Sequence, residues 1–246
     1  MNTTGFITVR TKSTRLPSKC LLPFGDCNVI EHIIFRAKHY DLDPIICTSI
    51  DTSDDILEEI ANKNNIKIFR GSLINKIKRW YDCCDYYNIE RFHTIDADDP
   101  FFDGELMKES MLLLEQGYDV VCPTESSSAG DASVGYSLTK ETIEKSLDYI
   151  EDEEDTEMIW YFLEKVRSLK TVVLPNPNNN PLKVRLTLDY EEDYWLLESV
   201  RKIVGNLTTR EAIDELFLKN PDLHKINWFR NEEWKEGQKN KTTILS

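Results

Sequence analysis

The chain has 246 residues, of which 30 are lysine or arginine and 44 are aspartate or glutamate, so its formal net charge is −14. This acidic balance argues against a nucleic-acid polymer as partner, because phosphate backbones are bound through basic surfaces. No apolar run approaches the roughly 18 residues that a membrane span needs, and the first residues lack the pattern of a secretory signal.

Strand-like and helix-like segments alternate through the first half of the chain. Strands are expected at residues 5–10, 44–49, 66–69, 91–95 and 118–122, and helices at 28–40, 54–63, 73–87 and 103–116. Asn28 and Glu31 have the spacing of a capping box at the start of the first helix. The alternation predicts an α/β fold with a mostly parallel sheet and helices on both faces.

The pattern loosens after residue 122. We expect a loop at 125–131, a strand at 133–138, helices at 139–149 and 158–166, and a solvated acidic connection at 151–155. Strands at 171–174 and 182–188 and helices at 193–204 and 209–218 follow, the last with Thr208 and Glu211 at capping-box spacing. No linker is visible, so we expect one domain over 1–246, with the helix and tail of 208–246 packing on it or on a partner.

The cysteines and histidines give the less specific signals. The six cysteines form no C-x-x-C pair and no zinc-type cluster, which predicts free thiols. Free thiols are typical of a reducing compartment, so we expect a cytoplasmic protein. His93 lies within a predicted strand and is expected to be a core residue rather than a catalytic base.

The strongest motif is the loop after the first strand. It contains the cations Arg10, Lys12, Arg15 and Lys19, with the hydroxyl residues Thr11 and Ser13 among them. A loop that leaves the carboxyl end of a first parallel strand faces the crevice where such folds bind ligands. Arginine and lysine hold phosphate oxygens well, so a nucleoside triphosphate is a complementary ligand. The alternative is an ordinary solvated surface loop.

A resemblance rests on this loop and on five later blocks. The segment Arg10…Ser13-Thr-Arg-Leu-Pro-Ser-Lys19…Leu22-Pro-Phe-Gly25 resembles the opening motif of the CMP-sugar synthetases, the acylneuraminate and 3-deoxy-manno-octulosonate cytidylyltransferases. It is most similar to their spore-coat (SpsF-like) branch. The later blocks, at 48–51, 69–72, 96–103, 185–193 and 220–227, follow in the same order. Ser18 stands where the family usually has glycine.

The resemblance implies a GT-A-like fold and CTP-dependent chemistry with Mg²⁺. It implies that Asp98 and Asp189 bind the metal and that Arg10, Arg15 and Lys19 are catalytic. The implied nucleotide contacts are Arg10, Thr11, Ser13, Arg15, Lys19, Thr48, Ser49, Asp51, Arg70, Gly71 and Ser72. Taken alone, each of the two aspartates is more often a helix cap or a solvated acid than a metal ligand, and Gly71 and Ser72 are consistent with a tight turn and a helix cap. We expect both aspartates to follow strands of one sheet and to meet at its carboxyl edge.

The implied activity is the transfer of CMP from CTP to an acidic sugar or a similar small acceptor, for surface polysaccharide synthesis by a homodimer. Residues 125–135 depart most from the family, and this region is where its acceptor pocket is expected. Two alternatives remain open. Asp96-Ala-Asp98 is also the D-x-D of a GT-A glycosyltransferase, and the protein could bind a nucleotide without catalysis.

Overall fold

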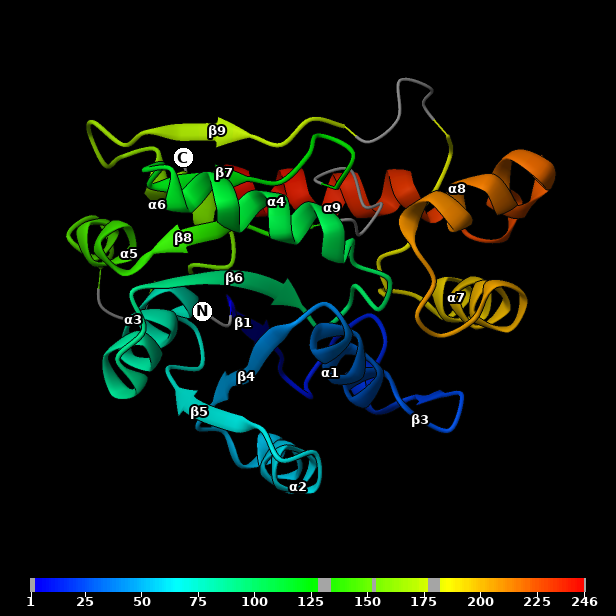
Figure 1. Cartoon of the computed structure of the whole chain (residues 1–246), viewed down its shortest axis with the longest axis horizontal. Coiled ribbons are helices and arrows are strands. Elements are labelled where there is room, and N and C mark those ends of the chain that lie inside the picture. Colours follow the sequence, from blue (N-terminus) through cyan, green and yellow to red (C-terminus); the bar gives the residue numbers. More distant parts are fainter. Residues whose placement is uncertain (1–2, 128–133, 152–153, 177–181, 246) are drawn as a thin grey trace.

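The computed structural model describes residues 3–127, 134–151, 154–176 and 182–245, with side chains up to residue 237. Its main sheet consists of β1 (Thr3–Thr8), β4 (Leu42–Ser49), β5 (Lys67–Gly71), β6 (Arg91–Asp96), β7 (Val120–Cys122), β8 (Ser137–Thr139) and β9 (Thr171–Val173). The strands lie in the order β5-β4-β1-β6-β8-β7-β9 (Figure 1). β8 is antiparallel to β6 and β7, and the other pairs are parallel. The predicted, mostly parallel α/β sheet is therefore confirmed.

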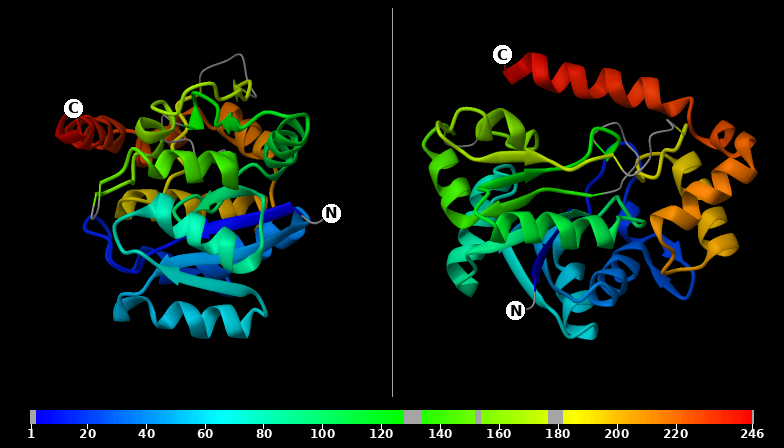
Figure 2. Two further views of the ribbon diagram at one scale, coloured as in Figure 1. Left: turned by 90° about the vertical axis from the view of Figure 1, so that its left-hand side faces the viewer. Right: turned by 45° about the horizontal axis from the view of Figure 1, so that its top comes forward.

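Helices cover both faces of this sheet (Figure 1 and Figure 2). One face packs against α1 (Val29–His39), α2 (Ile56–Lys63), α4 (Gly104–Glu115), α7 (Glu191–Val204) and α8 (Arg210–Lys219), and the other against α3 (Lys76–Tyr87), α5 (Lys140–Leu147) and α6 (Ile159–Leu163). Both faces of the sheet are apolar, as β1 illustrates: Phe6 contributes to the core on one face and its neighbour Ile7 to the core on the other. Alternating side chains on a strand point to opposite faces, so a strand that is buried on both must be apolar throughout.

The register of the central strands brings three loops to one edge. Thr8 at the end of β1 lies opposite Cys47 of β4 on one side and Asp96 of β6 on the other. The loops that follow these strands contain the basic motif, the segment after Ser49, and Asp98. Parallel strands present their carboxyl ends together, and this edge is the usual ligand-binding edge of such sheets.

Several predicted boundaries are correct and others are not. The capping box of α1 is present, because Asn28 accepts from the Glu31 amide and Glu31 accepts from the Asn28 amide. α3 begins at Lys76 rather than 73, and its N-cap is Asn75 rather than Ser72. The cap of α8 is Thr209, one residue beyond the expected Thr208.

The predicted strand at 182–188 is wrong. This segment has no regular secondary structure and pairs with no strand of the described sheet. Its backbone is instead tied to the loop after β6, where the Leu188 amide donates to the Asp98 carbonyl at 2.7 Å. The fully buried Arg185 side chain would be out of place in an apolar strand, and it explains why the apolar pattern of this segment does not lead to a sheet ladder.

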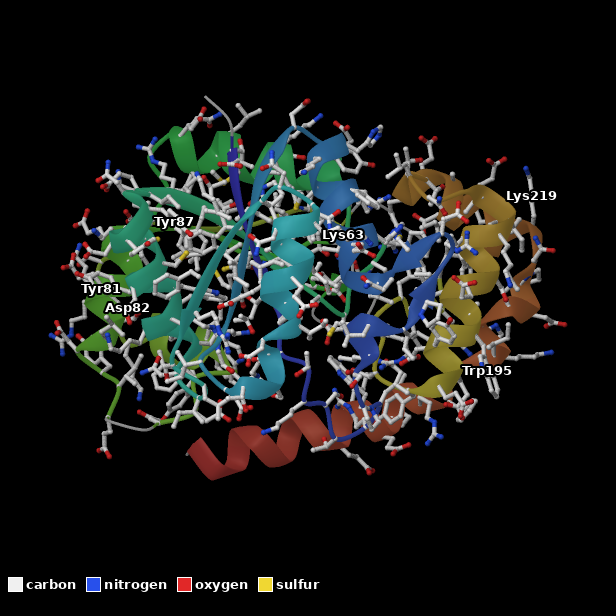
Figure 3. The ribbon with its side chains drawn as sticks, turned by 90° about the horizontal axis from the view of Figure 1, so that it is seen from below. Lys63, Tyr81, Asp82, Tyr87, Trp195 and Lys219 are labelled. Atoms are coloured by element: carbon white, nitrogen blue, oxygen red, sulfur yellow. The ribbon has the colours of Figure 1, made fainter. Side chains whose placement is uncertain are left out.

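The C-terminal part wraps around one end of the molecule. Leu216 and Phe217 of α8 are buried, and Leu223 and Ile226 of the short helix η4 (Pro221–Ile226) pack against the same core. α9 (Arg230–Leu245) then runs along the outside (Figure 2). Seen from below, α7 lies at the opposite end from α3 (Figure 3).

Other expectations concern the thiols, the histidine and membranes. All six cysteines are free, as predicted. His93 is fully buried, and its Nδ1 lies 2.8 Å from the Ser137 hydroxyl, so it is a core residue as expected. Within the described ranges, no helix has the length and apolar character needed to cross a bilayer.

Candidate active site

The centre of the site is the ammonium group of Lys19. Its Nζ donates to Asp98 Oδ2 at 2.8 Å, to Asp189 Oδ1 at 3.0 Å and to the Leu188 carbonyl at 2.8 Å. One cation therefore joins two carboxylates that lie ninety-one positions apart in sequence. Burial lowers the pKa of Lys19, but the charges of Asp98 and Asp189 outweigh burial and raise that pKa above its ordinary value. The ammonium stays charged.

Asp189 is the most deeply buried member of the cluster. Its side chain is 1% exposed, compared with 28% for Asp98. Arg15 donates to Asp189 Oδ1 at 2.5 Å, and Arg185 donates to Oδ2 at 3.3 Å. Burial raises the pKa of Asp189, but the surrounding cations outweigh it and hold that pKa below its usual range. A buried carboxylate with three cationic neighbours stays ionised because their charges offset its lost hydration.

Two backbone contacts bring the aspartates together. The Ala97 amide donates to the Thr8 carbonyl at 3.1 Å, so the chain after β6 continues alongside the end of β1. The bond from the Leu188 amide to the Asp98 carbonyl then joins the irregular segment to this loop. The two aspartates do meet at the carboxyl edge, as expected, but Asp189 reaches it from an irregular segment and not from a strand.

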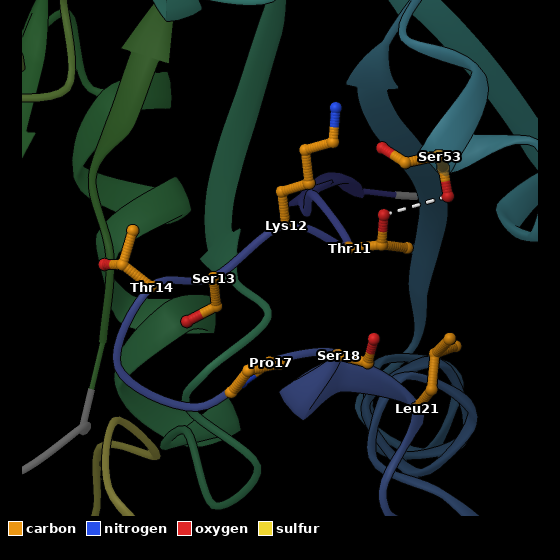
Figure 4. A pocket seen from close by; sticks show the side chains of 8 residues that line it. All are labelled: Thr11, Lys12, Ser13, Thr14, Pro17, Ser18, Leu21 and Ser53. Atoms are coloured by element: carbon orange, nitrogen blue, oxygen red, sulfur yellow. Dashed lines mark hydrogen bonds between the residues drawn. The ribbon is translucent and has the colours of Figure 1, made fainter.

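The first loop encloses a cavity of about 390 Å³. Its lining residues are Thr11, Lys12, Ser13, Thr14, Pro17, Ser18, Leu21 and Ser53. Thr11 and Ser13 face Pro17 and Ser18 across it (Figure 4). The volume falls at the lower end of the range for small-molecule sites. Five of the eight lining residues have hydroxyl groups and one is a lysine, although most of the lining surface is apolar.

Asp54 is a residue that the sequence reasoning did not identify. Its Oδ1 accepts from the Thr11 amide and hydroxyl, each at 2.8 Å, and its Oδ2 accepts from the hydroxyls of Thr48 at 2.9 Å and Ser49 at 2.5 Å. Thr48 and Ser49 are fully buried. Three of the predicted nucleotide contacts are therefore bonded to one carboxylate. Little in the sequence indicates this role, because Asp54 lies five residues after the strand-end pair Thr48-Ser49 and Asp51 lies closer to that pair.

Asp51 and Arg70 hold the neighbouring loop. Asp51 accepts from Lys12 Nζ at 2.9 Å and from the Ser53 amide at 2.9 Å. Arg70 donates to the carbonyls of Ser49 at 2.9 Å and Asp51 at 2.8 Å. These contacts give both residues a structural role.

Gly71 is the last residue of β5, and Ser72 follows it. A Cβ at Gly71 would lie 2.9 Å from the Phe69 ring and 3.1 Å from Arg79, so the site has no room for a side chain. The Ser72 hydroxyl accepts from the Asn75 amide at 3.0 Å and so fixes the turn before α3.

Arg10 is not brought together with Arg15 and Lys19. It donates to the Leu73 carbonyl at 3.0 Å and lies 3.9 Å from Glu157. The Asp96 carboxylate lies 3.9 Å from Lys76; burial raises its pKa, and the charges of Asp98 and Lys19 also act on that pKa. The four cations of the first loop are therefore distributed over three places, with Arg10 near Glu157, Lys12 on Asp51, and Arg15 and Lys19 on Asp189.

The Lys19 cluster offers a donor set for a divalent cation. Two carboxylates and a carbonyl already converge on one positive charge, and Mg²⁺ prefers such oxygen ligands with phosphates and waters completing its shell. Within the described part of the chain, no group of three or more His, Cys, Asp or Glu side chains could hold a metal. A pair of carboxylates is sufficient for Mg²⁺ that also binds a nucleotide, so the residues present fit this ion.

Comparison with known proteins places the chain among nucleotide-transferring enzymes. The family model described as cytidylyltransferase matches residues 4–196. The chain is 30% identical over 234 residues to an uncharacterized protein of Methanocaldococcus jannaschii, covering 92% of this chain and 95% of that protein. It is 25% identical over 228 residues to the spore coat polysaccharide biosynthesis protein SpsF of Bacillus subtilis, covering 88% and 94%.

The solved structures agree with this family. A cytidylyltransferase from Leptospira borgpetersenii superposes with a TM-score of 0.80 at 28% identity, over 91% of this chain and 96% of that one. A CMP:2-keto-3-deoxy-manno-octonic acid synthetase, solved with CTP, has a TM-score of 0.61 at 12% identity over 81% and 98%, which shows a shared fold. Because the family model spans most of the sequence, this chain belongs to the cytidylyltransferase family.

Proposed function

We propose that the protein transfers CMP from CTP to a hydroxyl group of an acidic sugar and releases pyrophosphate, in a reaction that requires Mg²⁺. The observation that carries the proposal is the Lys19 ammonium, which joins Asp98 and Asp189 at the edge of the sheet. This arrangement supplies cations for a triphosphate and carboxylates for a metal at one place. The cavity of the first loop is lined by Ser18, the sequence neighbour of Lys19, but not by Lys19, Asp98 or Asp189 themselves.

Lys19 and Arg15 have the chemistry to bind the triphosphate. Both are cations at the mouth of the site, with side chains 15% and 33% exposed. As the acceptor oxygen attacks the α-phosphorus, negative charge moves toward the leaving pyrophosphate. Fixed cations near that charge stabilise the transition state, and positioning does most of the remaining work in such transfers.

Asp98 and Asp189 would hold Mg²⁺. When bound, the ion would supply charge neutralisation at the phosphates and polarise the attacked group. The chain's own part is to keep both carboxylates ionised and close together. The cations around Asp189 lower its pKa, so its carboxylate is ionised at neutral pH.

The geometry favours this activity over a D-x-D glycosyltransferase. In a D-x-D site, Asp96 and Asp98 would act on one metal. Here Asp98 bonds to Lys19, whereas Asp96 lies near Lys76 of α3. The carboxylate that shares a cation with Asp98 is Asp189.

The acceptor class rests on the relatives. SpsF is named for polysaccharide biosynthesis, and the synthetase solved with CTP acts on a keto-deoxy sugar acid. We therefore propose a sugar acid as acceptor and a product used for surface polysaccharide. The proposal includes a cytoplasmic homodimer, for which the free thiols favour a reducing compartment.

The test is a pyrophosphate-release screen of each nucleoside triphosphate against a panel of sugar acids, with and without a chelator. We expect turnover with CTP and Mg²⁺ and none after chelation. Lys19→Ala should lose activity, whereas Lys63→Ala, which removes an exposed lysine of α2 (Figure 3), should retain it. Equal turnover with UTP, or hydrolysis of a UDP-sugar in place of CTP, would reject the proposal.

A further inference from the structure

A buried polar cluster lies directly behind Asp189. Arg185 Nη2 lies 3.3 Å from Asp189 Oδ2 and 3.1 Å from Asp193 Oδ2, and Arg185 Nε donates to Asp193 Oδ1 at 2.9 Å. Asn227 Nδ2 donates to Asp193 Oδ1 and to the Arg185 carbonyl, both at 2.9 Å. Arg185, Asp193 and Asn227 are each 0% exposed. We call these three residues the Asp193 cluster.

The Asp193 cluster also fixes the backbone that carries Asp189. Asp193 Oδ2 accepts from the amides of Asp189 at 2.9 Å and Tyr190 at 3.0 Å. The carboxylate thereby sets the turn from the irregular segment into α7. The Arg185 guanidinium holds the Asp189 side chain from behind, while Lys19 and Arg15 hold it from the front.

The third member of the cluster comes from beyond the family match. Asn227 follows η4, whereas the family model ends at residue 196. Arg230, three residues later, donates to both carboxylate oxygens of Glu192, at 3.1 and 2.9 Å, and its guanidinium lies 4.9 Å from the centre of the Tyr190 ring. The segment 227–230 therefore contacts the start of α7 at Asp193 and at the residues just before it.

We propose that Arg185, Asp193 and Asn227 are positioning residues that set the orientation of Asp189, and that the segment 227–230 is thereby a working part of the active site. The inference rests on the proposed function, because Asp189 acts there. Groups of this kind, which orient a ligating carboxylate without touching the ligand, commonly change metal affinity or activity about 10- to 100-fold when they are altered.

The chemistry of the cluster supports orientation over plain stability. A buried ion pair is a weak source of stability, and well-packed apolar side chains often replace one at no cost. The Asp193 cluster instead uses directional bonds, and each bond ends on Asp189, on its backbone or on a group that holds it. This arrangement restricts the rotation of one carboxylate, which an apolar core would leave free.

The experiment compares two substitutions of the same kind in the same segment. Asn227→Leu removes the donor to Asp193 and Arg185. Asn231→Leu is the control, because Asn231 is 1% exposed and its side-chain amide has no hydrogen-bond partner within the described ranges. Three readouts are taken: thermal unfolding, kcat and KM for CTP, and the rate of reductive methylation of Lys19 followed by mass spectrometry.

We expect Asn227→Leu to lower kcat about tenfold and to raise the methylation rate of Lys19 severalfold, because a misplaced Asp189 releases the ammonium. Asn231→Leu should leave kcat and the methylation rate of Lys19 within twofold of the wild-type values. If the two variants have equal kcat values and equal methylation rates of Lys19, the positioning role is overturned. If the wild-type protein turns over no CTP while Lys19 methylation still responds to Asn227→Leu alone, the proposed function fails and the positioning role stands.

Discussion

Two buried aspartates lie on either side of the first loop, and they are satisfied by different chemistry. Asp54 accepts hydrogen bonds from neutral groups, namely the Thr11 amide and the hydroxyls of Thr11, Thr48 and Ser49. Asp189 is held by cations, namely Lys19, Arg15 and Arg185. The loop is thus bonded to Asp54 at its start and to Asp189 near its end.

The difference indicates which aspartate is structural and which is functional. The hydroxyl and amide donors around Asp54 are buried and already bonded to its carboxylate, although Thr11 also lines the cavity of the first loop. The lysine and arginine at the front of Asp189 are partly exposed and could exchange this carboxylate for phosphate oxygens. Charged groups that can change partners are expected at sites of catalysis. Four predictions follow from this comparison.

The largest effect is expected at Asp189. Asp189→Asn keeps the shape of the side chain but removes the negative charge that holds the neighbouring cations. We therefore expect kcat to fall about 10²- to 10³-fold, as for the loss of one transition-state contact. Asp98→Asn should behave alike, and the double variant should be little worse because the two act as a unit. Pyrophosphate release checks turnover and circular dichroism checks folding. An active Asp189→Asn beside an inactive Asp96→Asn would contradict the metal assignment.

Asp54 should affect stability rather than chemistry. Asp54→Ala leaves several buried donors without an acceptor, and we expect a loss of about 3 kcal/mol in the free energy of unfolding. Urea unfolding measures it, with Asp51→Ala as the control, since Asp51 is partly exposed and makes fewer bonds. Activity per folded molecule should change little. A stable Asp54→Ala without activity would reverse the roles of the two aspartates.

Asp54, Asp98 and Asp189 show how much of the site could be predicted from the sequence. Asp98 and Asp189 could be paired from the order of the motif blocks, although only Asp98 follows a strand of the sheet. The role of Asp54 could not be predicted, since it depends on donors from the first loop and from the end of β4. The strand expected at 182–188 is wrong, and the apolar spacing of this segment could not reveal that Arg185 is buried against Asp189 and against Asp193 of α7. Asn227 lies still farther away in sequence and was expected only as part of a motif.

Lowering the pH should remove stability through the buried His93 at a higher pH than through Asp54 and Asp189. Burial lowers the pKa of His93 to about 3, from an ordinary value of 6.5. In the unfolded chain His93 therefore binds a proton at a pH where it stays neutral in the folded chain. The free energy of unfolding falls as the pH drops below 6.5. Between pH 7 and pH 5 this amounts to roughly 2 kcal/mol for His93.

Asp54 and Asp189 affect the stability of the fold in a lower pH range. Their pKa values are below the ordinary 3.8, so the stability they provide is present above that value and is lost only as pH falls further. Urea unfolding at pH 7 and pH 5 tests this division. His93→Gln should reduce the loss between the two pH values, while His39→Gln, an exposed position, should not. An unchanged loss in His93→Gln would show that other groups cause it.

The smallest effect is expected at Ser18, which connects the loop to Lys19. Ser18 has a φ of 53° and a ψ of 29°, a left-handed conformation that costs a residue with a Cβ about 1 kcal/mol. Ser18→Gly removes that strain but increases the freedom of the unfolded chain, so stability should rise by no more than about 0.5 kcal/mol. Ser18→Val should lose about 1 kcal/mol, because β-branching disfavours this region further. Urea unfolding measures both, and turnover should follow stability, since the backbone turn alone places Lys19 between the two carboxylates. If Ser18→Gly instead loses turnover while remaining folded, the serine hydroxyl contacts the ligand, and the loop contributes more to binding than the two aspartates that anchor it.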